Sequence, residues 1–323
     1  MDLPNLNALL AAQAGIARWI KPTAQPALES LGEQLGLQLH IKQENRTPAG
    51  AFKVRGGLHY LQQQLARQPG LRGVIAASTG NHGRSIAFAA RELGLSSAIV
   101  VPHHNNPQKN EAMRALGAEL VEQGHDFQAA LEYSMELAQQ RGWHAVPSFH
   151  PDLVCGVASY GLELLQAIPD LDAVFVPVGL GSGFCGLTAA RQALGHRAQL
   201  IAVVSAHAPA YALSVAAGQL IEAPSNTEIA EGVACRRPNP LALQWIAQHA
   251  AALLQVNDEQ ALEAMAILHR HGGEISEGSG ALALAALLAE APKWRGKRVA
   301  CVLSGGNVAQ SVWNRLQRDY LTI

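Results

Sequence analysis

The sequence has little charge, few aromatic residues and few cysteines for its 323 residues. Charged residues make up 15 % and aromatic residues 5 %, and 24 Lys and Arg balance 25 Asp and Glu to a net charge of -1. A protein that binds nucleic acid concentrates positive charge, so this balance argues against a nucleic-acid partner. The four cysteines, at positions 155, 185, 235 and 301, form no C-x-x-C pair and indicate the reduced thiols of a cytoplasmic protein.

Long hydrophobic runs are also missing. The longest purely apolar run covers the nine residues 281–289, whereas a membrane-spanning helix needs about 20. No basic residue precedes Arg18, which makes the N-terminus a poor secretory signal. With 49 % hydrophobic residues, the chain can build a large core in one α/β unit or two packed domains. We therefore expect a cytoplasmic protein with no membrane partner.

Apolar stretches typical of buried strands alternate with helical patterns along most of the chain. Strands are predicted at residues 73–77, 98–101, 119–121, 173–178, 200–205 and 299–303, and helices at residues 85–93, 107–116, 127–140, 160–167, 258–269 and 279–290. This alternation predicts an α/β fold whose parallel-rich sheets are covered by helices. Ligands bind beyond the carboxyl ends of such strands, so the loops that follow the strands are the candidate site.

The loop at residues 179–183, Gly-Leu-Gly-Ser-Gly, follows one of these strands and opens a helix. Backbone N–H groups of such a loop converge on an anion, helped by the dipole of the helix. Residues 181–186 also match the G-x-G-x-x-G pattern of dinucleotide binding, but no acidic residue ends the next strand to hold a ribose. An NAD-binding protein and a turn without a ligand therefore stay open beside a phosphate site.

Three other segments carry polar groups suited to the same edge of the sheet. Lys53 lies beside Phe52 in a Pro/Gly-rich loop, where apolar neighbours lower the pKa of an amine and favour Schiff-base chemistry. Such a lysine is more often a surface residue. The loop at residues 78–83, Ser-Thr-Gly-Asn-His-Gly, suits either a bound carboxylate or an ordinary helix N-cap, and Ser304 has the same two interpretations.

Taken in order, these segments resemble the motifs of fold-type II pyridoxal-phosphate enzymes, in the serine/threonine dehydratase and serine racemase group. The resemblance covers roughly residues 26–310 and includes Ala-Phe-Lys-Val-Arg-Gly at 51–56, which is similar to the cofactor-lysine motif of the family. Glu-Gly-Ser-Gly-Ala at 277–281 resembles the family's E-P-S-G-A motif. The resemblance implies the tryptophan synthase β-like fold, with pyridoxal 5'-phosphate held on Lys53 as a Schiff base.

The resemblance also implies a role for each site residue. It makes Lys53 and Thr79 catalytic, because Thr79 falls where racemases carry a serine that protonates the opposite face of the substrate. The cofactor-binding residues that it implies are Phe52, Lys53, Asn81, Gly179, Leu180, Gly181, Ser182, Gly183 and Ser304. The residues that it implies for the substrate carboxylate are Ser78, Gly80, Asn81 and His82. Both carboxylates of the family's divalent-metal segment are missing at 204–210, so we expect no metal.

The architecture implied by the resemblance has two domains. Residues 1–72 and 150–323 would form the large cofactor-binding domain, and residues 73–149 the small domain that binds the substrate carboxylate. The family also implies a homodimer. Since no regulatory domain follows residue 323, we expect an enzyme of amino-acid catabolism without feedback control.

The activity implied by the resemblance is a pyridoxal-phosphate-dependent dehydratase, or ammonia-lyase, that converts a 3-hydroxy amino acid to a 2-oxo acid and ammonia. L-Serine and L-threonine are the default substrates. The segment at 156–160, Gly-Val-Ala-Ser-Tyr, departs from the family pattern and leaves a bulkier analogue open, such as phenylserine or a hydroxyectoine-derived amino acid. An amino-acid racemase and a β-replacement synthase stay as alternatives, and an NAD-binding or non-catalytic protein is a remote one.

Overall fold

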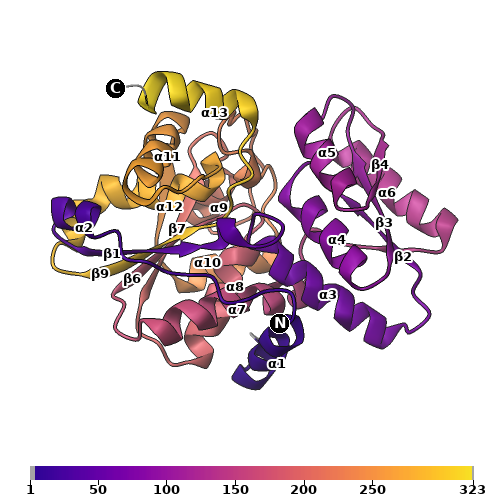
Figure 1. Cartoon of the computed structure of the whole chain (residues 1–323), viewed down its shortest axis with the longest axis horizontal. Coiled ribbons are helices and arrows are strands. Elements are labelled where there is room, and N and C mark those ends of the chain that lie inside the picture. Colours follow the sequence, from indigo (N-terminus) through magenta and orange to yellow (C-terminus); the bar gives the residue numbers. More distant parts are fainter. Residues whose placement is uncertain (1–3, 322–323) are drawn as a thin grey trace.

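Two parallel β-sheets organise the computed structural model, which describes residues 4–321 (Figure 1). The larger sheet has the order β1-β9-β6-β7-β8, made of β1 (Gln38–Gln43), β9 (Arg298–Leu303), β6 (Ala173–Pro177), β7 (Gln199–Ser205) and β8 (Ala250–Val256). The smaller sheet has the order β4-β3-β2-β5, made of β4 (Glu119–Glu122), β3 (Ser96–Val101), β2 (Gly73–Ala77) and β5 (His144–Ala145). Neighbouring strands are parallel in both sheets, and Figure 1 shows each sheet in a lobe of its own.

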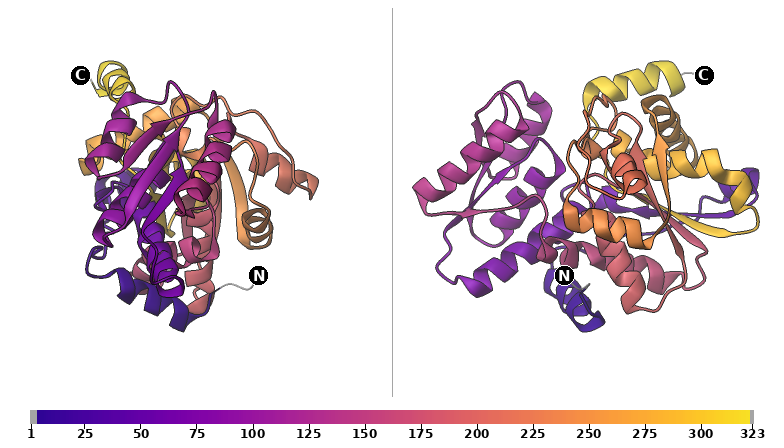
Figure 2. Two further views of the ribbon diagram at one scale, coloured as in Figure 1. Left: turned by 90° about the vertical axis from the view of Figure 1, so that its right-hand side faces the viewer. Right: turned by 180° about the vertical axis from the view of Figure 1, so that it is seen from behind.

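Helices connect the strands and cover the sheets. They are α1 (Leu6–Ile16), α2 (Glu29–Leu35), α3 (Lys53–Arg67), α4 (Asn81–Glu92), α5 (Pro107–Ala115), α6 (Phe127–Arg141), α7 (Pro151–Ala167), α8 (Ser182–Ala193), α9 (Ala210–Ala217), α10 (Pro240–His249), α11 (Asp258–Gly272), α12 (Gly278–Glu290) and α13 (Gln310–Leu316). Figure 2 shows the helices of both lobes from two further sides. Within residues 4–321, no helix is long and apolar enough to cross a membrane.

Strand β6 explains why the strands of the larger sheet are apolar throughout. Val174 and Val176 belong to the buried cluster that contains side chains of α7 and α8, whereas Phe175 belongs to the cluster that contains side chains of α11 and α12. Successive side chains of a strand point to opposite faces, so a sheet covered on both faces needs apolar residues at every position.

The predicted fold class, parallel sheets covered by helices, is confirmed. Each predicted strand is present with ends within two residues of the prediction. The sequence analysis missed β1, β5 and β8, and it started the helix predicted at 160–167 nine residues late, because α7 begins at Pro151. Strand β1 contains the buried but charged Lys42, and the Ala/Leu-rich β8 resembles a helix by composition, so neither carries the apolar signature of the other strands.

Helix α3 links the two lobes. Its residues Val54, Leu58 and Leu61 are buried in one cluster with Val74 of β2 and Ile86 of α4. The prediction that Lys53 lies in a Pro/Gly-rich loop is wrong, since Lys53 is the first residue of this helix. Helix α3 thus packs against the smaller sheet, although the predicted small domain starts only at residue 73. The assignment of residues 73–149 to a separate domain stays a prediction.

Candidate active site

The loops at the carboxyl ends of β6 and β9 meet at the start of α3. The backbone N–H of Phe52 donates to the carbonyl oxygen of Ser304, which follows β9, over 3.0 Å. A Cβ added to Gly183 would lie 3.4 Å from Cζ of Phe52, so the loop after β6 approaches the same ring. The structure therefore brings Lys53, Ser304 and the 179–183 loop together, as the sequence motifs predicted.

The pKa of the Lys53 amine is changed by the surroundings of these loops. Burial lowers its pKa from the usual value near 10.5 to about 8, and this effect is only partly opposed by Glu277 and Cys235. Its Nζ lies 5.2 Å from the centroid of the Phe52 ring and makes no hydrogen bond or ion pair to the described residues. A desolvated and unpaired amine is partly neutral near neutral pH, which makes it a nucleophile toward a carbonyl carbon.

The 179–183 loop is shaped by close packing at its glycines. Gly181 has a φ of 95°, and a Cβ there would lie 2.6 Å from the Cβ of Ala242. The hydroxyl of Tyr160 donates to the carbonyl of Gly183 over 2.7 Å, and that of Tyr211 donates to the carbonyl of Leu180 over 3.0 Å. Because the tyrosine hydroxyls satisfy these two carbonyl oxygens, the loop and the N-terminus of α8 can present their N–H groups to an anion. Ser182 begins α8 and is buried, beside these N–H groups.

The 78–83 loop opens α4 and supplies two different kinds of group. The Ser78 hydroxyl accepts from the N–H groups of Gly80 and Gly83 over 3.2 and 2.8 Å, and so satisfies N–H groups at the start of α4, although the N-cap residue itself is Gly80. His82 is buried, and burial together with the charge of Lys53 lowers its pKa to about 3. Its Nε2 has no hydrogen-bond partner within residues 4–321. A neutral imidazole with a free nitrogen is available to a ligand. Thr79 is exposed at the tip of the loop.

Asn81, the first residue of α4, is held from both sides. Its Nδ2 donates to Oε1 of Glu277 over 2.6 Å, and its Oδ1 accepts from Nδ2 of Asn307 over 2.7 Å. Burial raises the pKa of Glu277, whose carboxyl also lies within electrostatic range of Lys53. The sequence analysis assigned no role to Glu277, which begins the motif at 277–281, or to Asn307, which lies three residues after Ser304.

The sequence analysis gave no site role to Tyr211 and Arg84, and it connected Tyr160, the last residue of the 156–160 segment, only with the size of the substrate. The tyrosines lie on α7 and α9, and no local pattern marks them as partners of the 179–183 loop. Arg84 lies on α4, and its buried Nε has no hydrogen-bond partner in the part of the chain that the structure describes. Burial lowers its pKa, against the attraction of Glu277.

A cluster of buried charges lies beneath the start of α3. Arg55 pairs with Glu44 over 2.7 Å and with Glu163 over 2.6 Å, and Lys42 pairs with Glu163 over 2.6 Å. The side chains of Arg55, Glu44 and Lys42 are at most 1 % exposed. Because Arg55 lies two residues after Lys53, this cluster ties the first turn of α3 to β1 and α7.

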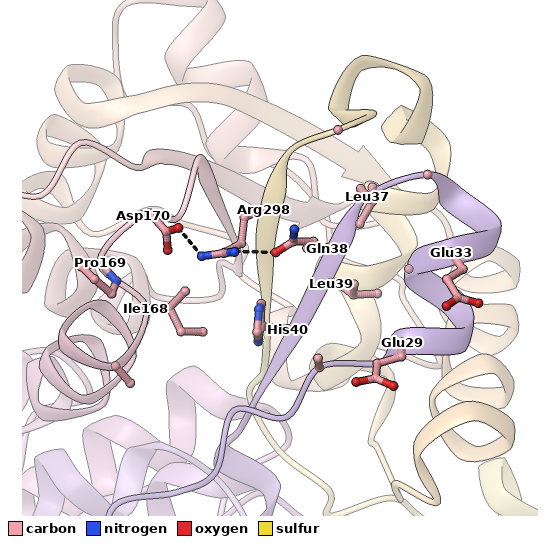
Figure 3. Close-up of a pocket in the computed structure, with 15 residues that line it drawn as sticks. Glu29, Glu33, Leu37, Gln38, Leu39, His40, Ile168, Pro169, Asp170 and Arg298 are labelled. Carbon is pink, nitrogen blue, oxygen red and sulfur yellow. Dashed lines mark hydrogen bonds and ion pairs between the residues drawn. The ribbon is translucent and has the colours of Figure 1, made fainter.

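A cavity of about 750 Å³ lies away from these loops, at the amino ends of β1 and β9 (Figure 3). Figure 3 shows Arg298 between Asp170 and Gln38, and its Nε donates to Oε1 of Gln38 over 2.6 Å. These polar groups satisfy one another, and the edge is opposite to the one where parallel sheets bind ligands. The cavity is therefore a weaker candidate than the site around Lys53.

Among residues 4–321, no group of three or more His, Cys, Asp and Glu side chains is arranged to hold a metal ion. The predicted absence of a divalent metal stays a prediction.

A family model described as "Pyridoxal-phosphate dependent enzyme" matches residues 16–305. The chain belongs to this family. The L-threonine ammonia-lyase of Thermotoga maritima is 30 % identical over 312 residues, which is 96 % of this chain and 77 % of that protein.

Solved structures of the family have the same fold. A threonine deaminase from T.th. superposes with a TM-score of 0.88 at 31 % identity, covering 95 % of this chain and 99 % of that one. Maize serine racemase superposes with a TM-score of 0.91 at 26 % identity, covering 99 % and 98 % of the two chains. The predicted family, fold type and pyridoxal-phosphate dependence are thereby confirmed.

The residues present fit the cofactor. The desolvated amine of Lys53, which has no partner among the described residues, suits the aldehyde of the cofactor. The 179–183 loop suits its phosphate, because its N–H groups can face an anion and its tight turn needs a glycine at position 181. The roles of the individual predicted residues stay predictions.

Proposed function

We propose that this protein is an ammonia-lyase that removes water from a 3-hydroxy amino acid and releases a 2-oxo acid and ammonia. The observation that carries the proposal is the desolvated amine of the half-buried Lys53, which has no partner among the described residues and lies near a glycine-rich loop that can present N–H groups to an anion. The names of the related threonine ammonia-lyase and threonine deaminase support this activity. L-Serine and L-threonine are the first substrates to test, followed by bulkier 3-hydroxy amino acids.

Four segments would hold the cofactor. Lys53 would bind its aldehyde carbon, the 179–183 loop its phosphate, Ser304 its ring nitrogen and Asn81 its ring oxygen, with Phe52 beside the ring. When bound, pyridoxal phosphate supplies an electron-withdrawing ring that acidifies the α-hydrogen of an attached amino acid. The chain supplies binding, orientation and proton transfer.

Lys53 is the proposed general base. Its lowered pKa lets the amine take the α-proton of the substrate near neutral pH. The substrate carboxylate would be held at the start of α4 by Ser78, Gly80, Asn81 and His82, where backbone N–H groups and the helix dipole favour an anion. Loss of the β-hydroxyl as water leaves an enamine, which hydrolyses to the 2-oxo acid and ammonia.

An amino-acid racemase is the second candidate. The exposed Thr79 hydroxyl lies in the loop proposed to bind the substrate, and the fold matches that of maize serine racemase. Thr79 would protonate the face opposite Lys53. Racemisation keeps the hydroxyl group, so chiral analysis of the recovered amino acid separates this activity from elimination.

The direct test is turnover by the purified, cofactor-loaded protein. We expect release of 2-oxo acid from at least one of L-serine, L-threonine and L-threo-phenylserine, and loss of this activity in Lys53→Ala. Lys293→Ala is the matched control, since Lys293 is an exposed lysine that pairs with Glu290, outside the candidate site. A Lys53→Ala variant with the wild-type rate would contradict the assignment.

The pH dependence of cofactor loading tests the state of Lys53 separately. Only the neutral amine attacks an aldehyde, so the loading rate of the apoprotein should rise about tenfold per pH unit below pH 8 and level off above it. The growth of the visible absorption band of the bound cofactor measures this rate. A rate that keeps rising to pH 10 would mean that the pKa of Lys53 is not lowered.

We further propose that the protein acts as a homodimer in the cytoplasm. Its relatives are enzymes that act on small amino acids, which is consistent with this setting. Sedimentation equilibrium of the loaded protein measures the oligomeric state, and a monomeric mass at micromolar concentration would contradict the dimer.

A further inference from the structure

Both ends of the Asn81 amide are held by side chains from the other lobe. Nδ2 donates to Glu277 and Oδ1 accepts from Asn307, over 2.6 and 2.7 Å. Glu277 directly precedes α12 and Asn307 follows β9, whereas Asn81 begins α4 beside the smaller sheet. These three side chains, which we call the Glu277–Asn81–Asn307 triad, therefore join the two lobes at the candidate site.

The direction of the hydrogen bonds in the triad is set by the backbone at one end. Nδ2 of Asn307 also donates to the carbonyl oxygen of Ala49 over 3.0 Å. A backbone carbonyl can only accept, so this end of the Asn307 side chain must be its nitrogen. The Asn81 atom that the same nitrogen reaches must then be the oxygen. The amide nitrogen of Asn81 is left facing Glu277, whose carboxyl can accept in either protonation state.

Packing holds the Glu277 carboxyl in place. A Cβ added to Gly305 would lie 2.6 Å from its Oε1, and one added to Gly232 would lie 3.5 Å away. The charged groups that act on it are Lys53, Arg84, Lys109 and Glu231. With backbone this close on two sides, the carboxyl has little room to turn away from Asn81.

We propose that Glu277 and Asn307 are positioning residues that lock the Asn81 amide in one orientation, so that its second Nδ2–H faces the ring oxygen of the cofactor. That N–H has no other partner among the described residues. A flipped amide would direct its oxygen at the ring oxygen and lose both bonds of the triad. The inference rests on the cofactor site of the proposed function, and it is independent of which amino acid the enzyme uses.

Spectroscopic titration of the apoprotein with pyridoxal phosphate tests this role without any turnover. Glu277→Leu removes the acceptor, and we expect the dissociation constant of the cofactor to rise about 5- to 100-fold, with a shifted visible band. Glu277→Gln keeps an acceptor oxygen, so its affinity should stay within about threefold of wild type and its band should be unchanged. Asn307→Asp removes the donor at nearly constant size and should behave like Glu277→Leu.

Glu274→Leu is the matched control. Glu274 lies three residues before Glu277 and is 2 % exposed, but its partners are Gln43, Asn45 and Arg46. We expect this variant to lose stability and to keep the wild-type band. If Glu277→Leu does not fold, Asn307→Asp and Glu277→Gln still decide the question.

The proposal is overturned if Glu277→Leu or Asn307→Asp binds the cofactor like wild type, if Glu277→Gln behaves like the leucine variant, or if Glu274→Leu shifts the band equally. A failure of the proposed function would look different. The protein would then load cofactor with these differences between variants and yet release no 2-oxo acid.

Discussion

At the scale of single residues, folding changes the behaviour of Lys53 more than its sequence neighbours suggest. In the unfolded chain its amine has a pKa near 10.5, and in the folded protein burial lowers the pKa to about 8. Nothing in the described part of the chain pairs with the amine. The apoprotein therefore keeps a destabilising charge below pH 8 that only the cofactor removes.

Lys53→Met should make the apoprotein more stable at pH 7, by about 2–4 kcal/mol, because a shift of one pKa unit corresponds to about 1.4 kcal/mol. The unfolded state binds more protons than the folded state between pH 8 and 10.5, so wild-type stability rises with pH through this window. The gap between the two proteins should shrink accordingly. Urea unfolding of both apoproteins at several pH values measures it, and a gap that does not change with pH would be contrary to this account.

At the scale of elements, the turn from β6 into α8 depends on a glycine for two reasons. Gly181 has a positive φ, and a side chain there would collide with Ala242 of α10. Gly181→Ala should lower cofactor affinity and destabilise the protein by about 1–3 kcal/mol. Gly195→Ala is the control, since Gly195 also has a positive φ, of 60°, but open space around its Cα. Equal losses in both variants would show that backbone strain alone explains the effect.

The buried charges under α3 give a second prediction at this scale. Glu163 accepts from both Lys42 and Arg55, and its removal leaves two buried cations short of a partner. Glu163→Gln should destabilise the protein by about 3–5 kcal/mol. Glu290→Gln, at the surface pair with Lys293, should cost less than about 1 kcal/mol. Thermal or urea unfolding compares the two, and a small loss for Glu163→Gln would mean that the cluster is not needed to hold α3.

At the scale of the whole molecule, the two lobes share helix α3. Its apolar side chains complete the core of the smaller sheet, although the predicted small domain starts only at residue 73. The two lobes are also joined by the ion pair between Lys109 of α5 and Glu231, and by the Glu277–Asn81–Asn307 triad. The hydrophobic core of the smaller lobe thus contains side chains from outside residues 73–149.

A fragment of residues 73–149 should therefore be poorly folded, because Val74 and Ile86 would lose their α3 neighbours and expose apolar surface. A longer fragment of residues 47–149, which includes α3, should show more cooperative unfolding and slower amide exchange. Circular dichroism and hydrogen exchange compare the fragments. Cooperative unfolding of the shorter one would support the predicted domain boundary.

The sequence by itself determined the strands with continuous apolar runs, the loops that follow them and the family. These features are local, since burial on both faces of a parallel sheet leaves its mark on every residue of β2 and β6 and on every residue of β7 after Gln199. It also singled out Lys53, whose motif is contiguous. Strand β1 and helix α3 were not predicted, because β1 is largely polar and α3 contains polar residues and two glycines near its start. Both elements are stabilised by partners that are distant in sequence.

Only the tertiary structure decided which groups surround Lys53. Glu277 and Asn307 reach Asn81 from 196 and 226 residues away, and Tyr160 reaches Gly183 from 23 residues away on another helix. Such contacts leave no periodic pattern, because they depend on how strands are ordered in the sheets and not on spacing along the chain. The lowered pKa of the Lys53 amine arises in the same way, since desolvation is a property of the assembled core.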